Sequence, residues 1–417
     1  MKRGNPGQWA RWGALMLGVL PLMAFAEQAI GVLQYRTGPY AALGTKVAGG
    51  LEDYLTLLNL RDGGVNGQPV KLLSCETGYR MDRVDVCARQ LQARGATVLN
   101  VPSSGAMLML DAWSEQQRMP LLMTGGFTPE PGKLATTSYQ FALGPDAAAE
   151  AEAMWRTLAQ AQVLRGKTVV DLYLDSDYAR AALPVLDGLA RQAEARLIHL
   201  PVSPPGEEQQ DAWGQIGRLK PAGMLLRGWD RMTPVALGKA VESGLPMSRI
   251  IGSSWSGLEE AVQPVAPQAK GYTSVSLVAE GQRFPVIEDI KRVVYGQGQG
   301  RMLQRQDLGS VAYNRGVMQG IILAEALRGG QSRFGVRSLD GRQWAWSLSH
   351  LNLSPARLQA LGAEGIMLPL QTRCQDRRGS TQLFLQRWDG RRWQPLPEKA
   401  GLAPSPAAES TSCHEGA

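Results

Sequence analysis

Short, continuous apolar runs alternate with longer segments of helical periodicity from residue 30 to residue 277. Continuous apolar runs of four to five residues are typical of parallel strands that are covered on both faces. The predicted strands are 30–34, 70–74, 97–101, 121–124, 168–174, 197–202, 223–226, 250–252 and 272–277. Predicted helices cover 41–60, 82–94, 106–118, 147–162, 178–196 and 234–243, and later 286–295 and 309–327.

This alternation predicts an α/β protein with doubly wound parallel sheets. The pattern runs through two rounds, one before and one after Gly144-Pro145. A chain of 417 residues is long enough for two cores. We therefore predict two parallel-sheet lobes.

Two loops stand out within the first round, at 102–105 and 125–129. In parallel sheets, ligands bind outside the carboxyl ends of the strands, where both loops are predicted to lie. Ser103 and Ser104 bring two hydroxyls to a helix N-terminus, which favours an anion such as a carboxylate. Either serine can instead serve only as the helix N-cap. Capping and ligand binding are compatible.

The first 26 residues have the form of a secretory signal. Lys2, Arg3 and Arg11 precede or flank an apolar stretch, and Ala24-Phe25-Ala26 gives a small-x-small cleavage site. The apolar stretch is shorter than a membrane span requires. We expect an exported, periplasmic protein whose mature chain begins near Glu27.

The charge pattern excludes a nucleic-acid interface. The formal charge is +7, and cleavage of the signal would leave +4, since three cations and no acid are lost. The remaining cations are scattered among acids rather than gathered in one patch. The tail from 397 to 417 is rich in Pro, Ala, Ser and Glu and is predicted to be disordered.

Four cysteines in an exported chain are candidates for disulfides. They permit three pairings, and nearness in sequence favours Cys75–Cys87, with Cys374–Cys413 as the second pair. Two free thiols remain an alternative. Neither a metal nor a cofactor is expected, because the three histidines are not spaced with cysteines as ligands are, and no glycine motif for a nucleotide is found.

Several short motifs follow one another along the chain in a specific order. They are Ile-Gly-Val at 30–32, Thr-Gly-Pro at 37–39, Gly-Gly-Val-Asn-Gly at 63–67, Ser-Ser-Gly-Ala at 103–106, Pro-Leu-Leu at 120–122, Gly-Gly-Phe-Thr-Pro-Glu at 125–130, Asp-Ser-Asp-Tyr at 175–178 and Gln-Arg-Trp-Asp-Gly at 386–390 followed by Trp393. In this order the chain resembles a type I periplasmic solute-binding protein of the branched-chain amino acid (Leu/Ile/Val) ABC-transporter class, from about residue 28 to 395. The last motif resembles the terminal β-hairpin of that class.

The resemblance implies two α/β lobes joined by three crossover strands, with the ligand held between them and closure by hinge motion. We place the crossovers near 141–144, 271–276 and 334–336. The N-terminal lobe is then 27–143 plus 276–335, and the C-terminal lobe 144–275 plus 336–396. Residues 339–351, with Trp344 and Trp346, are interpreted as an inserted hairpin.

The resemblance also implies which residues hold the ligand. On the first lobe it places Ser103, Ser104, Gly105 and Gly126 at a carboxylate, with Tyr40 and Leu43 at the side-chain pocket. Thr128 is the hydroxyl nearest to a family threonine whose position falls on Phe127. On the second lobe it places Tyr178 as an aromatic lid and Trp229 as a second aromatic residue.

The chain departs from the family at the acidic residue that pairs with a ligand ammonium. That position falls on Ser254 or Trp255, neither of which is acidic. A buried ammonium without a counter-charge is costly, so either Asp230 supplies the charge or the ligand is not an amino acid. With Phe127, Trp229 and Trp255 near the expected cleft, we favour an aromatic or other hydrophobic carboxylate, or an amide.

The predicted function is the substrate-binding component of an ABC importer, a monomer that delivers a small molecule to permease subunits and catalyses no reaction. A ligand sensor for a membrane receptor, built on the same fold, is an alternative. An exported serine hydrolase is a further alternative, although Gly-x-Ser-x-Gly does not surround Ser103.

Overall fold

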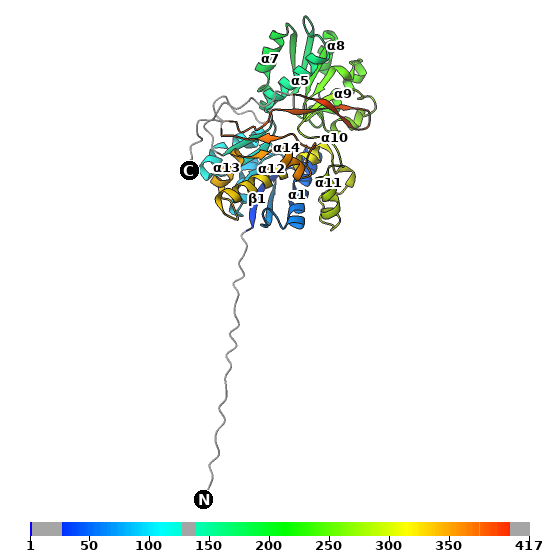
Figure 1. The fold of residues 1–417 in the computed structure, drawn as a ribbon. Coiled ribbons are helices and arrows are strands. Elements are labelled where there is room, and N and C mark those ends of the chain that lie inside the picture. The colour runs from blue at the N-terminus through cyan, green and yellow to red at the C-terminus, as the bar shows by residue number, and fades with distance from the viewer. Residues whose placement is uncertain (2–26, 127–138, 375, 401–417) are drawn as a thin grey trace.

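Two lobes, each built on a mainly parallel sheet, stand one above the other (Figure 1). The structure is a computed structural model that describes residues 1, 27–126, 139–374 and 376–400. Residues 2–26 of the expected signal segment, the residues Phe127 and Thr128, and the tail from 401 lie outside the described residues. The predicted two-lobed fold with parallel sheets is confirmed.

The first lobe contains a five-stranded parallel sheet in the order β2–β1–β3–β4–β5. Its strands are β1 (Gln28–Gln34), β2 (Val70–Glu76), β3 (Leu99–Asn100), β4 (Leu121–Thr124) and β5 (Gln140–Leu143). Its helices are α1 (Ala41–Asp62), α2 (Met81–Ala93), α3 (Ser104–Met109), α4 (Asp111–Gln117), α11 (Pro285–Asp289), α12 (Val311–Phe334), α13 (Gly341–Ser349) and α14 (Pro355–Ala360).

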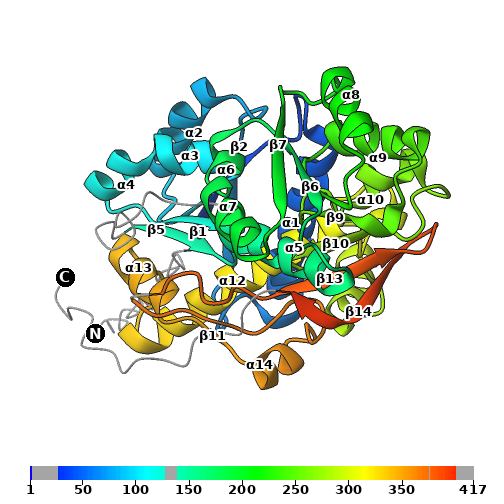
Figure 2. The ribbon, with the colours of Figure 1, turned by 90° about the horizontal axis from the view of Figure 1, so that it is seen from above.

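The second lobe contains a seven-stranded sheet in the order β14–β13–β10–β9–β8–β6–β7, in which β10 to β7 are parallel (Figure 2). Its strands are β6 (Thr168–Leu174), β7 (Arg196–Val202), β8 (Gly223–Arg227), β9 (Ile250–Gly252), β10 (Thr273–Ser276), β13 (Leu383–Trp388) and β14 (Trp393–Ala400). Its helices are α5 (Ala147–Ala161), α6 (Asp177–Arg180), α7 (Leu183–Gln192), α8 (Gln210–Leu219), α9 (Met232–Ser243) and α10 (Glu259–Val262).

Close packing of α1 against α12 fixes the side of the first lobe that faces the second. A Cβ on Gly50 would lie 2.0 Å from the carbonyl oxygen of Tyr313, and one on Gly316 would lie 2.0 Å from that of Val47. Only glycine permits the backbones to approach so closely. This contact holds the second turn of α12, which includes Arg315, at the junction of the lobes.

The chain passes between the lobes three times. It leaves the first sheet after β5 at Gly144 and returns after β10 at Leu277. The third passage contains the described residues 376–382, where the carbonyl of Arg378 accepts a hydrogen bond from Gly144 N at 2.8 Å. The expected crossover at 334–336 is therefore wrong: Phe334 ends α12, and Gly335 is its left-handed C-cap.

The segment after α12 belongs to the first lobe, contrary to the predicted boundary. Leu339 N donates to the side chain of Gln28 at 2.7 Å, and the indole of Trp344 donates to Thr97 Oγ1 at 3.1 Å. The inserted hairpin is also wrong, since residues 341–349 form α13, which begins with a capping box at Asp340. The two-stranded sheet of β11 (Asn352–Leu353) and β12 (Leu370–Gln371) follows.

Smaller differences concern where elements break. The helix expected over 178–196 is divided into α6 and α7, with Pro184 at the start of α7, and the helix expected over 106–118 is divided into α3 and α4. The β13–β14 hairpin extends to Ala400, so the expected disordered tail begins too early at 397. No helix among the described residues is long and apolar enough to cross a membrane.

The structure joins Cys75 and Cys87 in a disulfide, with 5.5 Å between their Cα atoms. This is the pair that nearness in sequence favours. Cys413 lies outside the described residues, so its pairing with Cys374 stays a prediction.

Candidate functional site

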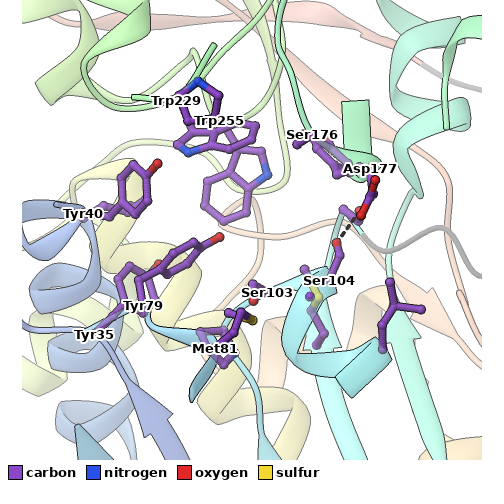
Figure 3. A pocket seen from close by; sticks show the side chains of 18 residues that line it. Tyr35, Tyr40, Tyr79, Met81, Ser103, Ser104, Ser176, Asp177, Trp229 and Trp255 are labelled. Atoms are coloured by element: carbon purple, nitrogen blue, oxygen red, sulfur yellow. Dashed lines mark hydrogen bonds between the residues drawn. The ribbon is translucent and has the colours of Figure 1, made fainter. Parts of the chain in front are cut away.

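A cavity of about 310 Å³ lies between the lobes at the carboxyl ends of their parallel strands (Figure 3). On the first lobe, its walls follow β1 to β4 in turn: Tyr35, Tyr40 and Leu43; Tyr79 and Met81; Pro102, Ser103, Ser104, Gly105 and Leu108; Met123 and Gly126. On the second lobe they follow β6 to β9: Ser176, Asp177 and Tyr178; Pro204; Trp229; Trp255. Both lobes thus contribute the edge at which such sheets bind ligands.

Most of the residues that the sequence singled out line this cavity. They are Tyr40, Leu43, Ser103, Ser104, Gly105, Gly126, Tyr178, Trp229 and Trp255. Ser254 and Asp230 do not line it, and Phe127 and Thr128 lie outside the described residues. Sequence reasoning missed Tyr35 and Met123, which lie at the ends of predicted strands, and also Tyr79, between β2 and α2, and Met81, at the start of α2.

The hydroxyl groups of Ser103 and Ser104 hold the bend at 102–105 in place through hydrogen bonds. Ser103 is the N-cap of α3, and its Oγ accepts a hydrogen bond from Ala106 N at 3.2 Å. Ser104 Oγ donates to the carbonyl oxygen of Gly126 at 3.2 Å, which joins this bend to the loop after β4. The capping role of Ser103 is therefore real, and it leaves the bend on the wall of the cavity.

Aromatic rings from both lobes give the cavity its apolar character. The ring of Tyr79 packs edge-on against Tyr35 and Tyr40, with centroids 5.2 and 4.8 Å away. Across the cavity, Tyr178 and Trp229 lie 6.4 Å apart, and Figure 3 shows Trp255 beside Trp229. Burial raises the pKa of Tyr79 to about 12, so this phenol stays neutral. Such walls suit a largely apolar solute.

The hydroxyl of Tyr178 turns away from solvent to a buried acid. It donates to Glu150 Oε2, and Glu150 Oε1 accepts from Ser254 N at 2.7 Å. Burial, followed by the charge of Glu150, raises the pKa of Tyr178 well above its ordinary value. Glu150 is only 5% exposed and lies on the face of α5 that packs inward, where the sequence pattern gave no reason to single it out.

Residues 27–392, most of the chain, match the family model described as periplasmic binding protein. The chain belongs to this family. Its members are exported binding proteins rather than enzymes.

Solved structures of similar proteins agree with this assignment. One from the Pseudomonas fluorescens group, described as an ABC transporter permease, is 32% identical, with a TM-score of 0.84 over 90% of this chain and 92% of that one. A branched-chain amino acid ABC transporter from Thermus thermophilus with bound valine is 17% identical (TM-score 0.76; 90% and 97% covered). A solute-binding protein from R. palustris in complex with benzoate is 15% identical (TM-score 0.67; 93% and 99% covered). The last two show a shared fold. No curated protein matches the chain.

Asp230 is poorly placed to serve this periplasmic binding protein as the partner of a ligand ammonium. It adopts a left-handed backbone conformation (φ 46°) directly after Trp229 and does not line the cavity. Burial raises the pKa of its carboxyl group. Its neighbour Arg227 is committed to the fold, since it forms a bidentate pair with buried Asp171 (both distances 2.7 Å) and donates to the carbonyl of Ala179. The hydrogen bond to Ala179 joins Arg227 to α6, the short helix that carries Tyr178.

Polar contacts at three places join the two lobes of this binding protein. Lys46 of α1 forms ion pairs with Glu260 of the second lobe and with Asp307. The carboxyl group of Glu259 accepts from Val311 N, which lies 3.0 and 3.1 Å from its two oxygens, at the start of α12. Arg315 Nη2 donates to the carbonyl oxygen of Ser254 at 2.8 Å. The lobes are therefore in contact in this conformation.

Proposed function

We propose that this protein is the substrate-binding component of an ABC importer. It captures a small organic solute between its lobes and presents the closed form to permease subunits in the inner membrane. The observation that carries the proposal is the cavity itself, whose walls come from strand ends of both lobes. A solute that contacts both walls stabilises the closed arrangement relative to the open one.

The size and lining of the cavity support a small, largely apolar solute. A volume of about 310 Å³ lies at the lower end of the range for ligand pockets. We infer that the solute is an aromatic or branched aliphatic carboxylate or amide, or an amino acid, whose apolar part packs against Tyr79, Trp229 and Trp255. The bend at 102–105 then contacts a polar group of the solute.

Delivery to a permease requires export. We propose that residues 1–26 are a signal peptide, that cleavage occurs near Ala26, and that the mature protein acts as a monomer in the periplasm. The structural relatives described above include proteins with bound valine and with benzoate, so the proposed range of solutes lies within what this fold accommodates.

A thermal-shift panel of amino acids, aromatic acids, amides and urea tests the proposal. We expect at least one compound to raise the melting temperature, and the same compound to reduce the radius of gyration in small-angle X-ray scattering. Trp229→Ala should weaken this response. Trp346→Ala is the matched control, because Trp346 lies on α13, outside the cavity. A compound that binds equally well to both variants without compaction would contradict the proposal.

A further inference from the structure

Two neighbouring turns carry the aromatic wall of the first lobe. Strands β1 and β2 pair in parallel, so the turns that follow them begin side by side. The turn at 35–40 follows β1 and carries Tyr35 and Tyr40, and the turn at 77–80 follows β2 and carries Tyr79. All three rings line the cavity, and Figure 3 shows the ring of Tyr79 reaching into it. The position of this wall therefore depends on how the two turns are held together.

The carboxyl group of Glu76 accepts hydrogen bonds from both turns. From the first turn, Arg36 N donates to Oε2 at 2.9 Å, and Thr37 donates to Oε1 through its backbone N at 3.2 Å and its hydroxyl at 2.9 Å. From the second turn, Gly78 N donates to Oε1 at 2.8 Å. Burial alone would raise the pKa of Glu76, but these hydrogen bonds lower it, so the group is charged at neutral pH. Glu76 is not one of the described residues that line the cavity.

The backbones of the two turns also approach each other closely. Gly38 has a φ of 83°, and a Cβ there would lie 2.4 Å from the carbonyl oxygen of Gly78. Tyr79 has a left-handed backbone conformation (φ 61°), which is strained for a bulky residue and persists only where its surroundings hold it. Strain of this kind concentrates at ligand-binding sites. The disulfide between Cys75 and Cys87 is a further restraint, because it closes the segment that carries Tyr79.

The charge of Glu76 strengthens the connection between the turns. A hydrogen bond to a charged group is roughly twice as strong as a neutral one, so a neutral side chain at this position would hold the turns less firmly. Glu76 is only partly buried, and water can therefore replace it as the acceptor for the N–H groups. Loss of the charge should then let the ring of Tyr79 move, without unfolding the lobe.

We propose that Glu76 is a positioning residue for solute binding, because it fixes the turns at 35–40 and 77–80 and thereby holds the ring of Tyr79 against the apolar part of the solute. The inference rests on the proposed function and adds a residue that sets the affinity without touching the solute. A wall that is already in place has less conformational freedom to lose when the solute binds.

A double-mutant cycle in isothermal titration calorimetry tests this role, with the panel compound that gives the largest thermal shift. Tyr79→Ala removes the ring and should raise the Kd by about 10- to 100-fold. Glu76→Gln keeps the size of the side chain but loses its charge, and should raise the Kd by about five- to tenfold. When the Tyr79→Ala substitution is already present, Glu76→Gln should change the Kd by less than about twofold, because no ring is left to position.

Three further variants complete the experiment. Glu76→Asp keeps the charge on a shorter side chain and should give an intermediate Kd. Asp85→Asn is the matched control, because Asp85 lies in the same disulfide-closed segment and its carboxylate forms an exposed ion pair with Arg89; it should leave the Kd unchanged. If Glu76→Gln does not fold, Thr37→Val replaces it, since exposed Thr37 donates one of the hydrogen bonds through its hydroxyl. This variant should raise the Kd by about two- to threefold, and only where the ring of Tyr79 is present.

A purely structural role of Glu76 predicts different results. If Glu76→Gln lowers the melting temperature but leaves the Kd unchanged, or raises the Kd equally with and without the ring of Tyr79, Glu76 does not position that ring. The inference is then wrong, whereas the proposed capture of a solute stands. If no compound of the panel binds or compacts the protein, the positioning role is wrong together with the proposed function.

Discussion

The ring of Tyr178, and not its hydroxyl, should hold the solute. The ring lines the cavity beside Trp229, whereas the hydroxyl donates to the buried carboxylate of Glu150. Tyr178→Phe and Tyr178→Ala therefore perturb different properties. The first removes a hydrogen bond inside the second lobe, and the second also removes a wall of the cavity.

The expected magnitudes separate the two variants. A hydrogen bond to a charged group contributes about 1.5–3 kcal/mol to stability, so Tyr178→Phe should lower the free energy of unfolding by that amount. Its Kd for a solute should stay within about threefold of the wild type. Burying an aromatic side chain is worth about 1.5–3 kcal/mol, so Tyr178→Ala should raise the Kd by about 10- to 100-fold.

Urea denaturation and calorimetric titration, with the panel compound that gives the largest thermal shift, measure the two quantities. A double-mutant cycle of Tyr178→Phe with Glu150→Gln should show a coupling free energy of about 1 kcal/mol or more in stability, because the two groups share one hydrogen bond. If Tyr178→Phe weakens binding as much as Tyr178→Ala, the hydroxyl contacts the solute and this reasoning is wrong.

Three further outcomes concern the frame around the site. Cys75→Ala with Cys87→Ala opens a short loop, since the cysteines are 12 positions apart, and should lower the free energy of unfolding by about 3 kcal/mol, checked against the reduced wild type. Burial and the charge of Glu260 raise the pKa of Glu259 to about 8. The folded state then keeps a proton that the unfolded state releases, so wild-type stability should fall between about pH 4.5 and 8, by at most about 4 kcal/mol, and Glu259→Gln should flatten this part of the urea-unfolding pH profile. Trp344→Ala should cost about 3–5 kcal/mol, because this fully buried side chain fastens α13 to the first lobe; a loss below 1 kcal/mol would contradict that placement.

Periodicity sufficed for the sheets because buried strands carry strong local signals. The runs 168–174 and 250–252 coincide with β6 and β9. The hydrophobic pattern gave a wrong prediction for residues 339–351, where the spacing of the apolar residues is that of a strand but the structure is a helix. Trp344 and Trp346 alternate as in a strand, but Asp340 and Gln343 form a capping box that starts a helix. The capping signal is local and was present in the sequence, so it could have corrected the interpretation of this segment as a hairpin.

The residues of the candidate site also fall into two groups, those that the sequence could identify and those that it could not. Residues in the loops after strands, such as Ser104 and Trp229, can be found from the order of elements, because parallel strands bring their carboxyl ends together. Glu150 and Arg315 cannot be found in this way, since each lies within a helix. Whether a charged helical residue faces solvent or a partner lobe depends on how the lobes meet, and this information is not local in sequence.

If the protein captures a solute by closing its lobes, as we propose, the strength of the contacts between the lobes determines how far closure depends on that solute. The side chains of Lys46 and Glu260 are 17% and 25% exposed, and ion pairs near the surface contribute only about 0–1 kcal/mol. Shifting an open–closed equilibrium from 1:99 to 99:1 requires about 5.5 kcal/mol of differential binding. At about 1.5–3 kcal/mol for each buried aromatic ring, contacts with Tyr178, Trp229 and Trp255 on the second lobe reach that scale, whereas the ion pair does not. Each alanine substitution at Tyr178, Trp229 or Trp255 should therefore reduce the compaction that a solute causes. Lys46→Met should change the Kd by no more than about fivefold.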